Sequence, residues 1–179
     1  MRNWFWLVAS LALSAPAAAQ GLLPPRVEIE YELKRNGSTM AEVEDVLEQA
    51  NGSYRLTVRW KGKGLYALLG RAKRTSEGPL GPNGPRPSEY VVERSGRDTQ
   101  RVSFDWKANT ITRRYKGRTT TEAVPPVSQD RLPSLFVLTF ASRGGQPVSF
   151  HVADGRGMSR HTYEPAGRER IGTPAGEFD

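Results

Sequence analysis

The sequence contains no cysteine among its 179 residues. It can therefore form no disulfide, offers no thiol nucleophile, and lacks the cysteine that carries a bacterial lipid anchor. A domain without disulfides must be held together by its own hydrophobic core. A chain of this length can bury about two-thirds of the surface that it exposes when unfolded, so we expect one self-supporting domain.

Long hydrophobic runs are also scarce, and the clearest one lies at the N-terminus. Arg2 is followed by an apolar run over about residues 4–13 and then by small residues that end at Ala19, which is the order found in a secretory signal peptide. The alternative, a membrane anchor, would need roughly 20 predominantly apolar residues. We therefore expect residues 1–19 to be a cleaved signal peptide, and residues 20–179 to be an exported, soluble, periplasmic domain with no transmembrane span.

Acidic residues are in the minority, with 19 Asp and Glu against 26 Lys and Arg, a net charge of +7. In a cytoplasmic protein such an excess would suggest nucleic acid as a partner. For an exported protein the available polyanions are phospholipid headgroups, lipopolysaccharide or teichoic acids. The basic residues are scattered among acidic neighbours, so a solvated, mixed-charge surface is favoured and nucleic acid is not an expected partner.

Catalytic and metal-binding patterns are few, since the chain has two histidines and no G-x-S-x-G motif. His151 and His161 lie on the two arms of one predicted hairpin. A turn centred after Gly155 places Arg160 opposite His151, so the histidines face opposite ways, although a one-residue shift in register would pair them.

A metal would also need a third ligand, and the nearest carboxylates, Asp154 and Glu164, have no recognisable metal-ligand spacing. The other acidic residues fall mostly at solvent-facing positions of predicted strands, so paired-carboxylate chemistry has no support. We expect no metal, no cofactor, no catalytic residue and no enzymatic activity.

Period-two alternation dominates the rest of the chain. Residues 26–34 alternate strictly between apolar and charged side chains, and residues 54–60 between apolar and polar ones, a pattern typical of half-buried antiparallel strands. Asn36-Gly37 and Asn51-Gly52 are tight-turn pairs. The segment between these pairs alternates less well, so a strand is predicted there with a helix as the alternative.

The next segments are expected to form a strand and then a loop. Residues 64–78 are apolar first and polar later, which predicts a strand bent at Gly70. Residues 78–87 are rich in glycine and proline, which favours an exposed loop. This loop is not a phosphate cradle, because proline removes the amide donors that such a cradle needs.

A hairpin is predicted over residues 103–117, "SFDWKANTITRRYKG". Val102, Phe104 and Trp106 share one face of the first strand, and the chain turns at about residues 107–109. Asp105 lies on the opposite face, where it is expected to meet solvent or a cation across the ladder rather than to take part in catalysis.

The spacing of the apolar residues changes once, at "SQDRLPSLFVLTFASRGG", where it approaches that of a helix. Ser128 or Asp130 can cap the start, and Pro133 is tolerated only in a first turn. We predict one helix at about residues 130–142, ended by the glycines that follow.

The predicted fold is therefore mainly β, a single antiparallel meander that forms a curved sheet or a partly open barrel with the one helix packed on it. Such a shape is similar to the open barrels of periplasmic lipoprotein carriers, whose concave apolar face holds acyl chains. Large aromatic side chains on strand faces are the candidate ligand contacts, although core packing explains any single one equally well. These candidates are Trp60, Tyr66, Tyr90, Phe104, Trp106 and Tyr115.

Three stretches, "FDWKANTITRRYKG", "SQDRLPSLFVL" and "GRERIGTPAGEF", together resemble the exported bacterial family catalogued as domain of unknown function 3108. "KGLYALLG" and "RPSEYVVER" fit it as well, and the resemblance runs from about residue 26 to the end. It implies secretion and a mostly antiparallel β-domain, with no established activity. The family pattern continues for more strands, so we expect the domain to be truncated at its C-terminal end. The motif positions are Asp105, Gln129, Asp130, Gly167, Glu169 and Gly176.

The sequence favours two functions. The first is a non-catalytic binding or carrier module in the cell envelope, with a lipid or other amphiphile as its ligand. The second is a structural envelope protein that binds another protein through a sheet edge or through the glycine- and proline-rich loop. An envelope enzyme is the least favoured. A solvent-open surface lined by aromatic side chains would support the first.

Overall fold

A computed structural model of the chain describes residues 24–141, 146–174 and 176–178. The predicted signal peptide and the glycines expected to end the helix lie outside the described residues. Within them, no helix is long and apolar enough to cross a membrane.

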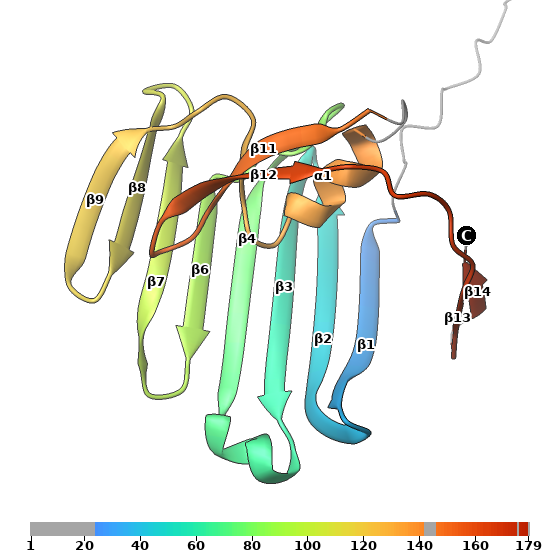
Figure 1. Cartoon of the computed structure of the whole chain (residues 1–179). Helices are drawn as coiled ribbons and strands as arrows, with labels where there is room; N and C mark the ends of the chain where they lie inside the picture. The colour runs from blue at the N-terminus through green and yellow to red at the C-terminus, as the bar shows by residue number, and fades with distance from the viewer. Residues whose placement is uncertain (1–23, 142–145, 175, 179) are drawn as a thin grey trace, which may run out of the picture.

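The molecule is built on one large antiparallel sheet of nine strands, in which neighbours in sequence are mostly neighbours in space (Figure 1). Its order is β1-β2-β3-β4-β6-β7-β8-β9, with the short β5 paired to the end of β4. The strands are β1 (Arg26–Arg35), β2 (Ser38–Ala50), β3 (Ser53–Gly62), β4 (Arg71–Gly81), β5 (Gly84–Pro85), β6 (Glu89–Arg94), β7 (Arg97–Asp105), β8 (Thr110–Tyr115) and β9 (Arg118–Ala123).

Tight turns at asparagine and glycine set the register of the meander, as the sequence predicts. Asn36 and Asn51 have φ values of 49° and 52°, and the glycine after each is also left-handed, at 79° and 71°. These are the conformations that two-residue hairpins with the twist of the sheet require. The segment between the two turns is the strand β2, so the helical alternative is wrong.

A second layer crosses one face of the sheet, which we call the inner face (Figure 1). It contains β10 (Ser128–Asp130), β11 (Val148–Ala153), β12 (Met158–Tyr163) and the helix α1 (Ser134–Ala141). β10 pairs in parallel with β11, and β11 pairs antiparallel with β12. A separate small hairpin, β13 (Ile171–Thr173) with β14 (Gly176–Phe178), follows at the end of the chain.

The core lies between these two layers. Tyr90, Val102 and Ile111 of the sheet are at most 1 % exposed. Leu132, which precedes α1, and Ala153 of β11 pack against the same cluster from the second layer. Alternation in β6, β7 and β8 points these side chains inward. Arg113 of β8 shares this face, lies opposite Val102, and pairs with Glu122 at 2.8 Å.

The large sheet is open. β1 and β9 are its two edges and do not pair with each other, so the curved-sheet form of the prediction is confirmed and a closed barrel is not formed. Antiparallel sheets of this kind commonly pack one face on a core and leave the other in water.

Two segments differ from the sequence expectation. Residues 64–69, predicted as a strand, form the 3₁₀ helix η1 (Gly64–Leu69), and β4 begins only at Arg71. The glycine- and proline-rich segment, predicted as a loop, is partly sheet. Pro79 extends β4. A proline is possible there because β6 pairs with β4 only as far as Glu77. Beyond Pro79, the end of β4 pairs with the short β5.

The helix begins later than predicted. Pro133 directly precedes the helix and fixes its start, and α1 spans Ser134–Ala141. Ser128 and Asp130, expected as helix caps, belong to β10. Asp130 instead accepts a hydrogen bond from the backbone amide of Leu132 at 2.8 Å.

Both predicted hairpins form, and the first strand of the 103–117 hairpin ends at Asp105, so Trp106 lies in the turn. Phe104 lies opposite Ile111 across β7 and β8, and Asn109 turns with a φ of 53°. His151 lies opposite Arg160, whereas His161 lies opposite Phe150. The two histidines therefore point to opposite faces of their hairpin, and the one-residue shift that would pair them does not occur.

Candidate functional site

The inner face of the sheet is covered only in part. Cross-strand registers place Tyr31, Val43, Trp60 and Ala72 in one row across β1 to β4. The second layer crosses the strands nearer their other ends (Figure 1), and at the β1 edge large apolar side chains stay exposed. We call this exposed part the open inner face, and define it by Ile29, Tyr31, Leu33, Trp60 and Ala72. Val43 lies in the same row but is buried, at 5 % exposed.

Exposure of large apolar side chains marks this surface. Ile29, Tyr31 and Leu33 of β1 are 53 %, 41 % and 42 % exposed. Trp60 of β3 is half-buried beside them. Single exposed apolar residues are ordinary on a protein surface, but a contiguous group along one sheet face is typical of a binding surface.

The 3₁₀ helix η1 bounds the open inner face at the far end from the second layer. An ideal Cβ on Gly62 would lie 2.1 Å from the carbonyl oxygen of Tyr66, so the backbone of η1 crosses the sheet there. Gly62 alternates with Trp60 and therefore points to the inner face. Only glycine allows the helix to approach so closely, and the result is a ledge beside Trp60.

Two charged groups, Asp45 and Arg74, lie in one cross-strand row of the inner face and interrupt the apolar surface. Asp45 of β2 lies opposite Ile29 and Val58 and so points to the inner face. Tyr31 donates a hydrogen bond from its hydroxyl to Oδ2 of Asp45 at 3.4 Å. The other oxygen, Oδ1, is buried and has no hydrogen-bond partner in the described part of the chain. Burial raises the pKa of Asp45, against the opposing influence of the Tyr31 hydroxyl and of Arg74.

A buried acceptor without a partner is costly. The cost is recovered if a ligand donates a hydrogen bond to it. The open inner face thus combines an apolar surface with one unused acceptor, which is the composition expected of a small-molecule site.

The aromatic residues proposed from the sequence divide between this surface and the core. Trp60 lies on the open inner face, and Tyr66 lies in the adjoining η1, where it is half-buried. The Trp60 indole makes no hydrogen bond to any described residue, so its N–H is free to meet a ligand. Tyr90 and Phe104 are 1 % and 6 % exposed and belong to the core.

The remaining two aromatics lie elsewhere. Trp106 stacks on Phe104 with ring centres 5.5 Å apart, and its indole donates to the carbonyl of Pro87 at 2.7 Å. Tyr115, on β8, lies 5.6 Å from the ammonium of Lys116. The structure therefore brings together Trp60 and Tyr66, separates Trp106, and places Tyr115 near the opposite edge of the sheet.

A chain of buried polar groups runs beneath the second layer. The Tyr54 hydroxyl lies 2.8 Å from Oγ of Ser76, and Ser76 donates to Oδ2 of Asp130 at 2.6 Å. Asp130 is fully buried, and this burial raises its pKa to about 7. A perturbed acid is a frequent sign of catalysis. Here, however, no part of the carboxyl group reaches solvent, so the group ties β10 to β4 and has no access to a substrate.

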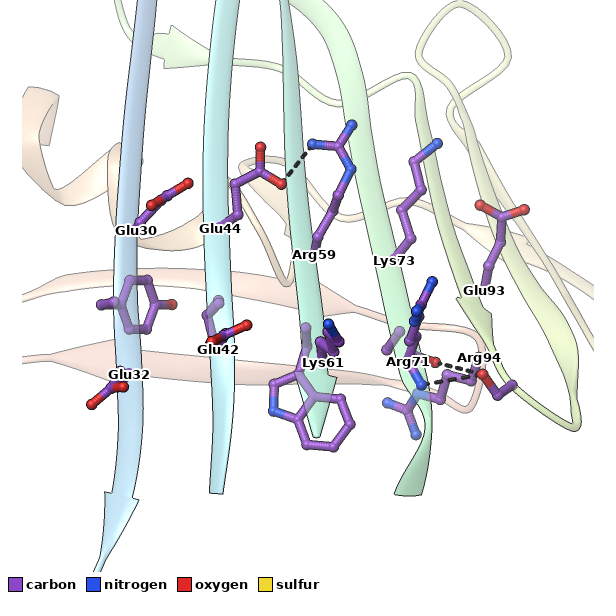
Figure 2. Close-up of a pocket in the computed structure, with 15 residues that line it drawn as sticks. Glu30, Glu32, Glu42, Glu44, Arg59, Lys61, Arg71, Lys73, Glu93 and Arg94 are labelled. Carbon is purple, nitrogen blue, oxygen red and sulfur yellow. Dashed lines mark hydrogen bonds and ion pairs between the residues drawn. The ribbon is translucent and has the colours of Figure 1, made fainter. Parts of the chain in front are cut away.

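The outer face of the same strands carries a charged groove of about 980 Å³. Figure 2 shows acidic side chains from β1 and β2 on one side of it and basic side chains from β3 and β4 on the other. Glu44 and Arg59 form an ion pair across the boundary at 3.0 Å. Both side chains remain substantially exposed, so such a pair contributes little to stability.

A third hollow, of about 630 Å³, lies among the proline-containing loops at one end of the sheet. Trp106 and Gln129 line it, and the guanidinium of Arg86 lies 4.4 Å from the centre of the Trp106 ring. Gln129 donates to the carbonyl of Pro85 at 2.9 Å, while its own carbonyl oxygen is buried without a partner. We call this the rim pocket.

The family model described as "Protein of unknown function (DUF3108)" matches residues 28–179. The chain belongs to the DUF3108 family. No curated protein and no solved structure matches the chain, so the geometry of this DUF3108 domain is the main guide to its function.

The motif positions of the DUF3108 resemblance have distinct structural places. Asp105 is exposed, and its Oδ1 accepts the backbone amides of Lys107 and Ala108 at 3.0 and 2.9 Å. It therefore fixes the turn between β7 and β8. Gln129 and Asp130 lie side by side on β10, one lining the rim pocket and the other in the buried chain of polar groups.

The remaining motif positions, Gly167, Glu169 and Gly176, lie in the exposed C-terminal segment around β13 and β14. β13 and β14 form a separate two-stranded sheet, drawn beyond β1 in Figure 1. Among the residues that the structure describes, no three His, Asp or Glu side chains are grouped so as to hold a metal.

The sequence analysis did not identify two residues of these sites, Asp45 and Ser76. A signal for Asp45 was available, because Ala41, Val43 and Leu47 share its face and a lone acid among them is unusual. No comparable signal marks Ser76, whose role depends on contact with a residue 54 positions away.

Proposed function

We propose that this protein is an exported, periplasmic, non-catalytic module that binds or carries an amphiphilic ligand of the cell envelope. The open inner face is the proposed binding surface. The observation that carries the proposal is that Ile29, Tyr31 and Leu33 remain 41–53 % exposed in a row beside Trp60, on the inner face of an open sheet. Water contact with such a surface is unfavourable, and an acyl chain would remove it.

The ligand proposed has an apolar chain and at least one hydrogen-bond donor. The chain would lie along Leu33 and Trp60, between the ledge of η1 and the second layer. The donor, such as a hydroxyl or an ammonium, would reach Oδ1 of Asp45, which is buried without a partner in the described residues. A raised pKa does not remove this acceptor, because a protonated Asp45 still presents a carbonyl oxygen.

Export is the second component of the proposal. It rests on the order of residues 1–19, with a cation, a short apolar run and small residues before the predicted cleavage. A periplasmic protein meets phospholipids, lipoproteins and their fragments, all of which carry acyl chains. The compartment and the surface therefore support the same class of ligand.

The proposal excludes catalysis on chemical grounds. The strongly perturbed acid, Asp130, is sealed in the core. Asp45 has no nucleophile beside it, because its inner-face neighbours are apolar residues, the hydrogen-bonded Tyr31 and, one strand beyond Val58, the cation Arg74. A surface of this kind can hold and release a ligand but offers no group to transform it.

Native mass spectrometry tests the proposal directly. The full reading frame is expressed with its own N-terminus, purified from the periplasm without detergent, and extracted with organic solvent. We expect a defined adduct at near-unit occupancy whose extract contains an acyl chain. An adduct-free mass, with no uptake when envelope lipids are added, would refute the proposal.

Matched substitutions locate the ligand. Trp60→Ala is expected to reduce occupancy at least tenfold, and Asp45→Asn to reduce it less, because asparagine keeps a carbonyl acceptor. Tyr115→Ala, at the other edge of the sheet, is the control and should leave occupancy unchanged. Equal loss in all three variants would place the ligand elsewhere.

A second candidate function has its own observation. We propose that the rim pocket would serve a structural or partner-binding role, because the Gln129 carbonyl oxygen is buried and unpartnered beside Trp106. An extended segment of another envelope protein could donate a backbone amide to it. Affinity purification from the periplasm with Gln129→Leu as the comparison tests this role, which predicts a partner that the wild type retains and the variant loses.

A further inference from the structure

The helix η1 exposes three leucines that neither the core nor the open inner face uses. Leu65 and Leu68 are 92 % and 95 % exposed, and Leu69 is 62 % exposed. They project from the β3–β4 connection at one end of the sheet (Figure 1). Loop tips on a soluble surface are usually polar, so this tip requires an explanation.

The basic residues are concentrated at the same end of the sheet. In a meander alternate connections lie together, and this end holds the β1–β2, β3–β4, β6–β7 and β8–β9 connections (Figure 1). Counting each connection with two residues on either side, the end carries ten cations and two acids, Glu93 and Asp98. The first two connections contribute Lys34, Arg35, Lys61, Lys63 and Arg71. The other two contribute Arg94, Arg97, Arg114, Lys116 and Arg118.

The opposite end of the sheet provides an internal comparison. Its three connections, counted in the same way, hold two cations, Arg86 and Lys107, and two acids, Asp105 and Glu89. The net charge is therefore +8 at the end with η1, which we call the basic end, and zero at the other. The whole chain has a net charge of +7, so the basic end accounts for all of the excess.

Most of these cations are not neutralised by the protein. Lys34 pairs with Glu32 at 3.1 Å and Lys63 pairs with Glu42 at 2.5 Å. The other eight form no ion pair with any residue that the structure describes. Lys61 and Arg71 even lie directly opposite each other in the β3–β4 register, an arrangement of like charges that opposes folding.

We propose that the basic end docks on the surface of a bilayer containing anionic phospholipids, with the leucines of η1 inserted at the boundary between headgroups and acyl chains. Anionic headgroups attract clustered Lys and Arg, and apolar side chains partition into the interface beside them. A bilayer satisfies both halves of this surface. An extended polyanion such as nucleic acid would pair with the cations but leave the leucines in water.

The docking does not depend on the proposed ligand. It has a consequence if both are correct, because η1 is also the ledge of the open inner face. Docking through η1 would bring Trp60 next to the membrane, where an amphiphile could transfer between the bilayer and the protein.

Vesicle flotation with the full chain tests the docking. Vesicles of phosphatidylcholine alone are compared with vesicles containing phosphatidylglycerol, at low and high salt. We expect binding to the anionic vesicles only, weakened severalfold by salt because exposed charges are screened. Equal binding to neutral vesicles would overturn the electrostatic half of the proposal, and no binding to either would overturn all of it.

Two double variants separate the contributions. Leu65→Ser with Leu68→Ser, and Arg35→Gln with Lys116→Gln, are each expected to weaken vesicle binding at least tenfold while circular dichroism and thermal unfolding stay unchanged. The controls at the neutral end, Val127→Ser and Lys107→Gln, should stay within twofold of the wild type. Val127 is a suitable comparison because it is 60 % exposed.

Binding partners other than a bilayer would give different results in these experiments. If the leucines are covered by a second copy of the chain, the leucine variant will change the oligomeric state in sizing experiments, and the bilayer proposal fails. If the surface is a general polyanion site, DNA will bind as tightly as vesicles and the leucine variant will bind normally, which also overturns it. Loss of docking with retention of the native ligand would leave the proposed function intact.

Discussion

The two halves of the inner face belong to the same sheet but differ in how deeply their apolar residues are buried. On one half, Val102 and Ile111 are fully buried beneath the second layer. On the other half, Ile29 and Leu33 have the same alternation and the same side-chain type but are about half exposed. Strand pattern therefore selects which face is apolar, whereas the second layer decides which part of that face becomes core.

The comparison also separates stability from function. Residues of the covered half can be exchanged only at a cost in folding free energy, because close packing leaves no room to relax. Residues of the open half contribute little to folding but determine what the surface can bind. Substitutions matched across the two halves should therefore have opposite consequences.

The largest effect on stability is expected in the covered half. Phe104→Ala removes a ring that is 6 % exposed and stacked on Trp106, so the free energy of unfolding should fall by about 3–5 kcal/mol. Urea unfolding followed by circular dichroism measures this. A loss under about 1 kcal/mol would show that the second layer does not pack on the sheet as described.

The buried acid should give the next largest effect, as a dependence on pH. The pKa of Asp130 is about 7 in the folded protein against an ordinary value of 3.8. Between these values the folded state holds a proton that the unfolded state releases, so the free energy of unfolding falls as pH rises from about 4 to about 7. The contribution is on the order of 4 kcal/mol, at about 1.4 kcal/mol for each pKa unit.

Asp130→Asn removes this contribution. Its carbonyl oxygen can still accept the amide of Leu132, and its NH2 group can donate to Oγ of Ser76, which reverses the direction of that hydrogen bond. Unfolding in urea at several pH values between 4 and 8 should show a fall for the wild type relative to the variant. Asp105→Asn, at an exposed turn position, is the control and should keep the wild-type slope. Parallel curves for the wild type and Asp130→Asn would contradict the burial of this carboxyl group.

The smallest effect is expected in the open half. Leu33→Ala shortens a side chain that is 42 % exposed, so the free energy of unfolding should change by less than about 1 kcal/mol. Occupancy by the native ligand, measured by mass spectrometry, should nevertheless fall. A large loss of stability would mean that Leu33 belongs to the core, and the two halves would no longer differ in kind.

Much of the sheet was predictable from the sequence because its signals are local. Strict alternation in residues 26–34 and the turn at Asn36-Gly37 define the first hairpin without tertiary information. The register of His151 opposite Arg160 followed from the position of one turn. Each of these features depends on residues close together in the chain.

The wrong predictions concern features that depend on contacts between residues distant in the sequence. Residues 64–69 are an apolar run of the kind that a buried strand can form, but Gly62 lets η1 fold back against the sheet. Asp130 looks like a helix cap, yet its partner is Ser76 on β4. The basic residues are scattered in the sequence. They come together only in the fold, because alternate turns of the meander lie at the same end of the sheet.

The central claim, that the open half binds an amphiphile and the covered half does not, is tested most directly by tryptophan fluorescence. A lysophospholipid brominated on its acyl chain quenches an indole that it touches. Trp60 lies on the open inner face, and Trp106 is held against Phe104 and hydrogen-bonded to Pro87. We predict saturable quenching that Trp60→Phe abolishes and Trp106→Phe preserves. Quenching that survives Trp60→Phe and disappears in Trp106→Phe would place the ligand in the rim pocket and contradict the account.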